Sequence, residues 1–236
     1  MAEVKIEIMS IFGKVLFEYT KEDNTIRDTV IEAVKRGANL RDAYLGDANL
    51  VGAYLRGAYL GGADLGGADL GGANLRDAYL GDAYLVGAYL GDANLGGAYL
   101  GDANLGGADL GGANLVGANL GGADLVGAYL GDANLGDANL GDAYLVGAYL
   151  GDADLGDAGK LSKPDDILIV GNIGSRLGYT TIYNTDNGIY VRCGCFFGNI
   201  DEFVKKVEET HKGTQHERDY KALIEFAKVK FSKNEQ

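Results

Sequence analysis

Several residue types are scarce in this sequence, and each scarcity narrows what the protein can be. The 236 residues include no tryptophan, one proline and two cysteines. Two cysteines do not make a disulfide framework, which favours a reducing compartment. No apolar run approaches the roughly 18 residues of a membrane span, and residues 1–10 lack the basic start and apolar core of a signal peptide. We therefore expect a cytoplasmic protein that does not engage a membrane.

Basic residues are also few. The chain carries 34 acidic and 21 basic residues, a net charge of −13. The imbalance lies in residues 38–157, where 16 aspartates accompany only three arginines, Arg41, Arg56 and Arg76. Nucleic-acid-binding surfaces need a basic footprint. The composition therefore argues against direct nucleic-acid binding.

One five-residue unit dominates the rest of the composition. From residue 38 to residue 157 the unit A-(N/D/Y)-L-(G/V/R)-(G/D) occurs 24 times without interruption. On a helix its leucines would fall about 140° apart, and on a strand they would alternate between faces, so neither element gives a constant apolar side. A chain that turns a corner once per unit satisfies the pattern, and Gly, Asp and Asn supply the turns. The repeat therefore predicts a solenoid with leucine inside and the residue between Ala and Leu outside.

This A(D/N)LXX repeat resembles the pentapeptide-repeat family over 120 of the 236 residues. The resemblance implies a mainly β fold, a right-handed, four-sided parallel β-helix with about 20 residues per coil. The repeat would then form about six coils. One column of structural core leucines would recur once per coil: Leu40, Leu60, Leu80, Leu100, Leu120 and Leu140.

Outward side chains 20 residues apart would also form columns on such a coil. Tyr59, Tyr79 and Tyr99 are thereby predicted to form a ladder at about 5 Å spacing, close enough for offset stacking. Cross-strand packing is one interpretation of this ladder, and a contact surface for a protein partner is the other. Aspartates would stack in the same way, as solvated charge or as weak cation sites, in three pairs: Asp82 with Asp102, Asp132 with Asp152, and Asp137 with Asp157.

The two flanking segments are expected to be small α+β caps, because an open solenoid end exposes leucines and strand edges. In residues 1–37 we expect a hairpin of strands 4–10 and 14–19, then a helix with Thr25 as its N-cap, Asp28 at N3 and Gly37 after its end. In residues 158–236 we expect strands at 167–170, 179–183 and 188–197. A hairpin turn at 185–188, a helix opened by a capping box between Asn199 and Glu202, and a helix near 215–231 complete this segment.

Few residues outside the repeat invite a chemical interpretation. Cys193 and Cys195 lack the partners of a metal site and are interpreted as buried or idle thiols. His211 and His216 are expected to be surface histidines. The glycine-rich stretch 171–178 lacks the lysine of a phosphate loop and is predicted to be a turn. The sequence therefore assigns no catalytic residue, metal or cofactor.

The outward position uses only Asn, Asp and Tyr, nine, five and ten times. One degenerate codon encodes these three residues, so we hypothesise a consensus or library-built solenoid. The expected function is a non-enzymatic structural scaffold. The alternative is a protein-binding module that uses the acidic, tyrosine-rich face. The resemblance adds DNA mimicry to that alternative, because some members of the family resemble acidic double-helical DNA and inhibit gyrase; the neutral α+β C-terminal segment departs from the helical pairing segment typical of those inhibitors. The sequence names neither a partner nor an oligomeric state.

Overall fold

The computed structural model describes the chain except for residues 1, 162–165, 172, 174–179, 195 and 233–236. Its contacts divide the chain into two units, Met1–Ala153 and Asp154–Gln236. The division falls inside the last copy of the repeat rather than after Asp157. There Asp154 pairs antiparallel with Lys160, and a short 3-10 helix, η1 (Gly156–Ala158), follows. The parallel pattern of the repeat therefore stops at the start of the second unit.

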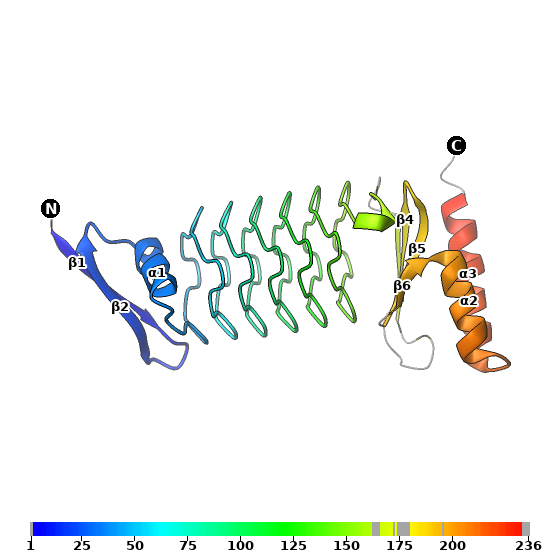
Figure 1. Ribbon diagram of the computed structural model, residues 1–236, viewed down its shortest axis with the longest axis horizontal. Helices are drawn as coiled ribbons and strands as arrows, with labels where there is room; N and C mark the ends of the chain where they lie inside the picture. The colour runs from blue at the N-terminus through cyan, green and yellow to red at the C-terminus, as the bar shows by residue number, and fades with distance from the viewer. Residues whose placement is uncertain (1, 162–165, 172, 174–179, 195, 233–236) are drawn as a thin grey trace. The chain divides into compact units, whose positions relative to one another are not determined.

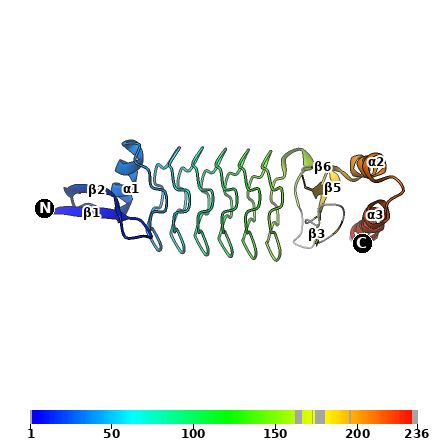
Figure 2. The same cartoon turned by 90° about the horizontal axis from the view of Figure 1, so that it is seen from below.

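In the first unit the repeat forms a solenoid in which residues 20 apart pair as parallel β-bridges (Figures 1 and 2). The hydrogen bonds are the same from coil to coil; for example, Leu80 N–H donates to the Tyr99 carbonyl at 2.7 Å and Tyr79 N–H donates to the Ala58 carbonyl at 2.9 Å. The coil length of 20 residues agrees with the resemblance. Four ladders of bridges run along the coils, and they begin at Asn39, Tyr44, Asn49 and Tyr54.

Alanine and leucine fill the inside of the coils. Every leucine of the repeat is at most 6% exposed. The predicted core column is buried throughout: Leu40, Leu60, Leu80, Leu100, Leu120 and Leu140. Since leucine contributes roughly 2 kcal/mol when buried, this column and its three counterparts are the main source of the solenoid's stability.

Each corner of the coil holds one residue in the left-handed backbone region. This residue is the fifth of the unit, and from Asp42 to Asp152 its φ lies between 55° and 71°. Glycine adopts this conformation without strain, and Asp is one of the few other residues that visit it routinely. The backbone therefore explains why the fifth position takes residues that tolerate a positive φ, as Gly and Asp do.

A hairpin and a helix precede the first coil. Strands β1 (Glu3–Met9) and β2 (Val15–Glu22) pair antiparallel, and α1 (Ile26–Lys35) follows. Thr25 is the N-cap, since its side chain accepts a bond from Asp28 N–H at 3.1 Å, and Gly37 has a positive φ of 69° after the helix. These two helix boundaries confirm the predictions from the sequence.

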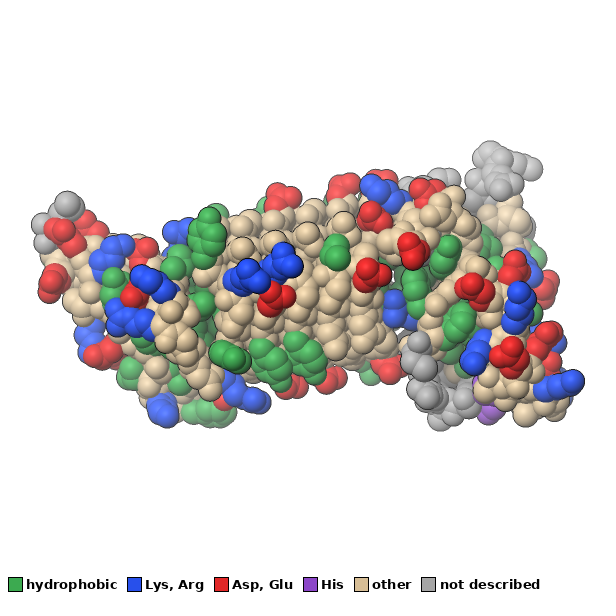
Figure 3. Space-filling model, in the orientation of Figure 1, with side chains coloured by type: hydrophobic (Ala, Val, Ile, Leu, Met, Phe, Trp, Pro, Cys, Tyr) green, Lys and Arg blue, Asp and Glu red, His purple; other side chains and the backbone are tan. Residues whose placement is uncertain are grey.

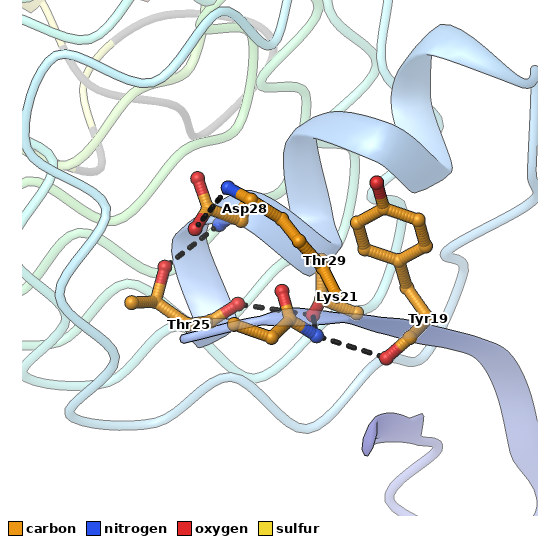
Figure 4. A network of polar contacts seen from close by, with 6 residues as sticks. Tyr19, Lys21, Thr25, Asp28 and Thr29 are labelled. Atoms are coloured by element: carbon orange, nitrogen blue, oxygen red, sulfur yellow. Dashed lines mark hydrogen bonds and ion pairs between the residues drawn. The ribbon is translucent and has the colours of Figure 1, made fainter. Parts of the chain in front are cut away.

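Polar contacts join the hairpin to α1 (Figure 4). Lys21 Nζ lies 3.1 Å from Asp28 Oδ2, and this hydrogen bond lowers the pKa of the Asp28 carboxyl. Thr29 Oγ1 donates to the Thr25 carbonyl at 2.9 Å. Asn24 Nδ2 donates both to the Tyr19 carbonyl at 2.8 Å and to Thr29 Oγ1 at 3.0 Å. The start of α1 is thus held against the end of β2.

The same elements bond to the first coil. Ile11 N–H donates to the Asp42 carbonyl, and Tyr44 N–H donates to the Met9 carbonyl, each at 2.8 Å. From α1, Arg27 Nε donates to the Val51 carbonyl at 2.7 Å. Backbone groups of the first coil that have no preceding coil to bond are therefore paired with the hairpin and with α1.

The second unit is a four-stranded antiparallel sheet with two helices. The sheet order is β3 (Ile167–Val170), β4 (Thr180–Thr185), β5 (Gly188–Cys193) and β6 (Phe196–Asn199). The single strand predicted over 188–197 is wrong, because the chain reverses at Gly194, where φ is 56°, and pairs back on itself as β5 and β6. The strand predicted over 179–183 corresponds to β4, and Tyr179 lies outside the described residues.

Both helices of the second unit pack on the sheet. The capping box between Asn199 and Glu202 opens α2 (Ile200–His211), as predicted, and α3 is Gln215–Ser232. One buried cluster joins the sheet to the helices: Ile182, Val191, Phe203, Val207, Tyr220, Leu223, Ile224, Ala227 and Phe231. None of the helices in the described part of the chain has the length and apolar character of a membrane span.

Candidate functional site: the outer face of the solenoid

The outward asparagines and aspartates bond to their own backbone. All fourteen accept, through Oδ1, a hydrogen bond from the N–H two residues later, at 2.9–3.3 Å. This is an Asx-turn, in which a side-chain oxygen caps a backbone donor at a corner. These side chains therefore stabilise the coil at its turns, which agrees with the turn-forming role expected for Asn and Asp.

Replacing Asn114 with alanine tests this role. Asn114 Oδ1 accepts from Val116 N–H at 3.1 Å. Loss of this hydrogen bond is expected to lower the free energy of unfolding by about 1 kcal/mol, the usual net contribution of such a bond. Asn114→Asp keeps the acceptor and is expected to have little effect. Denaturant unfolding of both variants measures the difference, and an equal loss in the two would contradict the Asx-turn assignment.

The ten outward tyrosines pack in another way. Each is 38–72% exposed, and several lie over turn glycines. A Cβ built on Gly81 would stand 2.6 Å from Tyr99 Cε1, and one on Gly101 would stand 2.6 Å from the Tyr99 hydroxyl oxygen. The ring of Tyr99 therefore occupies space that the two glycines leave open, one in the preceding coil and one in its own.

Tyr59, Tyr79 and Tyr99 occupy successive positions of one ladder, as the 20-residue column requires. The rings of Tyr79 and Tyr99 stack with centroids 5.0 Å apart and planes within 5°. Tyr59 is more exposed than these two, 60% against 38%. The structure thus brings Tyr79 and Tyr99 together as a stacked pair at one end of the predicted ladder.

A second stacked pair was missed from the sequence. Tyr129 and Tyr149 have centroids 5.0 Å apart and planes within 6°. They belong to the ladder that begins at Asn49. Reading that column at 20-residue intervals would have found them. In Figure 3, hydrophobic side chains, a class that includes tyrosine, gather along one edge of the repeat.

The corner aspartates lean toward the following coil. Where that coil has glycine at the same corner, the carboxylate stands close to the point that a Cβ would occupy, as Asp102 does at Gly122. Asp82 and Asp102 occupy the same corner of neighbouring coils, since Asp82 N–H donates to the Gly101 carbonyl at 3.0 Å. Asp77 differs from these two aspartates because it forms ion pairs with arginines. Arg56 Nη2 lies 3.2 Å from Asp77 Oδ2, and Arg76 Nε lies 3.7 Å from the same oxygen.

The candidate residues of the second unit form no reactive centre that the structure describes. Cys193 is half-buried, with its Sγ accepting from Thr180 Oγ1 at 3.3 Å, and Cys195 lies outside the described residues, as does most of the stretch 171–178. His211 and His216 are each partly exposed, and their ring centroids lie 5.7 Å apart. Among the described residues no group of three or more His, Cys, Asp or Glu side chains is placed to hold a metal.

The regular corners, inner leucines and 20-residue ladders now identify the fold family. The family model described as pentapeptide repeats matches residues 36–72, 73–112, 93–132 and 123–158, together just over half of the chain. The chain belongs to the pentapeptide-repeat family. No curated protein sequence matches this pentapeptide-repeat chain significantly.

Solved structures of other pentapeptide-repeat proteins are similar to parts of the chain. One from the thylakoid lumen of Arabidopsis thaliana is 36% identical over 40% of this chain and 66% of its own, with a TM-score of 0.39. One from the cyanobacterium Cyanothece 51142 is 38% identical over 41% and 60%, with a TM-score of 0.31. QnrB1, a plasmid-mediated fluoroquinolone resistance protein, is 24% identical over 46% and 58%, with a TM-score of 0.29. The chain spans less than two thirds of the length of each.

Proposed function

We propose that this pentapeptide-repeat protein is a non-enzymatic structural scaffold, a right-handed, four-sided solenoid with an end unit on each side of the repeat in the chain. The observation that supports the proposal is that the repeat's side chains have structural tasks. Every leucine of the repeat is buried, and all fourteen outward Asn and Asp side chains bond to their own backbone. Catalysis needs a positioned nucleophile or an acid and a base of different pKa. The repeat offers the same few side chains in the same environment from coil to coil.

Thermal unfolding without any added ligand tests the scaffold. We expect a β-type circular dichroism spectrum that persists above roughly 65 °C, the upper end for ordinary domains, and is lost in one transition. A scaffold that needs a partner to fold would instead lose this signal at low temperature and in several steps. That result would contradict the proposal.

We further propose that the repeat has a consensus or library-built origin. The support is that Ala and Leu recur 24 times without one substitution. Natural repeats accumulate substitutions, particularly where a core tolerates hydrophobic exchange. The coding DNA decides the matter, because unrelated codons at the outward positions would contradict a single degenerate codon.

A protein-binding module is the second candidate, and the exposed tyrosines favour it. Ten outward rings on an acidic surface have the composition of many contact surfaces, in which tyrosine is enriched. DNA mimicry toward an enzyme such as gyrase is one form of this candidate. A gyrase supercoiling assay tests that form, and no inhibition at tens of micromolar protein would remove it.

A further inference from the structure

We infer that the solenoid surface carries a binding site for a planar aromatic cation, formed by the open face of the Tyr99 ring and the carboxylate of Asp102. This inference goes beyond the scaffold role and does not depend on it. Three features carry it: the end of the Tyr79–Tyr99 stack, the direction of the Asp102 side chain, and the lack of a ring in the coil that follows.

The stack of tyrosines ends at Tyr99. The next residue of the ladder is Asn119, whose Oδ1 accepts from Gly121 N–H at 2.9 Å. A Cβ on Gly121 would find Asn119, Asn139 and the Gly141 carbonyl as its nearest neighbours, whereas one on Gly81 would meet the Tyr99 ring. The place that a third ring would occupy, above Asn119 and Gly121, is therefore lined by asparagine amides and holds no ring, and it is open to a flat ligand in that sense.

A negative charge stands beside this open place. The Asp102 carboxylate leans over Gly122, which belongs to the same coil as Asn119 and follows Gly121 directly. Asp82 adds a second carboxylate at the same corner one coil earlier. Both aspartates are exposed. Like charges one coil apart repel each other, and a cation beside them reduces that repulsion.

Another ladder offers a comparison. Tyr89 is also followed at its corner by an aspartate, Asp92, which leans over Gly112. The next residue of that ladder is Asp109, and Tyr129 follows one coil later, with its Cε1 2.8 Å from a Cβ built on Gly111. The place beyond Tyr89 is therefore bounded by a second ring on its far side, whereas the place beyond Tyr99 is followed by Asn119 and Asn139.

The geometry selects the class of ligand. Successive rings stand 5.0 Å apart, so the open place accommodates one flat layer beyond Tyr99. A delocalised cation is attracted to the face of an aromatic ring, and the adjacent carboxylate adds direct charge attraction. A planar aromatic cation combines both properties, while a neutral or anionic ring system of the same size lacks the second.

Titration of the full chain with thioflavin T, a flat cationic dye, tests the site by fluorescence. Three variants probe it with residues that the repeat already uses at the same positions. Tyr99→Asn removes the ring, Asp102→Gly removes the charge, and Asn119→Tyr extends the stack into the open place. The ring of Asn119→Tyr has the glycines it needs, Gly101 and Gly121. Each is expected to weaken binding roughly fivefold or more, the worth of one exposed cation–π or charge contact.

Two control variants should bind the dye within twofold of the native chain. Asp92→Gly removes the same charge beside Tyr89, where a second ring bounds the place, and Tyr54→Asn removes an exposed tyrosine from another ladder. Circular dichroism verifies that each variant is folded, and three independent site variants keep the test valid if one is not. Absence of saturable binding to the native chain would overturn the inference. So would native affinity in Asn119→Tyr, equal losses in Asp92→Gly and Asp102→Gly, or equal binding of an anionic dye such as anilinonaphthalene sulfonate.

Discussion

Replacing Leu100 with alanine is expected to lower the free energy of unfolding by about 3–5 kcal/mol, the range found when a buried leucine leaves a cavity that does not collapse. Leu100 is fully buried near the middle of its column, between Leu80 and Leu120. Its own N–H donates to the Asn119 carbonyl at 2.7 Å, which holds the backbone to the next coil. Because the backbones on both sides are bonded coil to coil, the surrounding layers have little freedom to move into the cavity.

Denaturant unfolding of the full chain measures this loss. Tyr54→Asn, which changes an exposed side chain outside the core, serves as the control and should stay within about 0.5 kcal/mol of the native value. A loss below about 1 kcal/mol for Leu100→Ala would mean that the column is loosely packed. The solenoid's stability would then have to come from its hydrogen bonds instead.

Replacing Gly107 with valine is expected to cost about 2 kcal/mol, the second-largest effect that we predict. Gly107 has a φ of 63°, and a Cβ at this position would meet nothing within 4 Å. The expected cost is therefore that of the left-handed backbone itself, which a β-branched residue tolerates poorly. No steric clash contributes.

Gly107→Asp provides the matched comparison. Ten aspartates of the first unit occupy the same position of other repeats with φ between 55° and 60°. The corner that includes Gly107 has glycine in both neighbouring coils, Gly87 and Gly127, so a new carboxylate would face no like charge there. We expect Gly107→Asp to change stability by less than half as much as Gly107→Val. Equal losses would show that the left-handed conformation does not determine the residue at this corner.

The buried core of the solenoid could be predicted from the sequence because its residues recur with a strict period. Ala and Leu sit two residues apart in every unit, and five residues suit only a chain that turns. The coil length came from the resemblance to the family. Helix starts at Thr25 and Asn199 were also readable, since a cap depends on residues only three positions apart.

The packing of the outward side chains was harder to predict because their contacts join residues about 20 positions apart. The packing of Tyr99 depends on Gly81 in the preceding coil as much as on its own Gly101. The stack of Tyr129 on Tyr149 depends on the column that both share. The break at Gly194 has another cause. A positive φ ends the strand there, although the flanking residues all favour strands.

Two positions of the unit each use only two or three residue types, and the structure gives them different explanations. At the fifth position, Gly and Asp both tolerate a left-handed corner, so the exclusion of most other residue types there has a physical cause. At the outward position, Asn and Asp cap the corner, but tyrosine does not. The alternation of tyrosine with Asn and Asp therefore remains the better support for a designed origin.

The four ladders have a consequence for insertions and deletions. Removing five residues would keep the Ala and Leu rhythm and the buried core, yet it would carry every later outward side chain to the neighbouring side of the coil. With one unit removed before it, Tyr129 would join the ladder of Tyr84 and Asn104 instead of that of Tyr89 and Asp109. Removing twenty residues would return each side chain to its own ladder. The number of five-residue units between the first coil and a given residue thus determines the ladder on which its outward side chain lies. The buried core does not depend on that number.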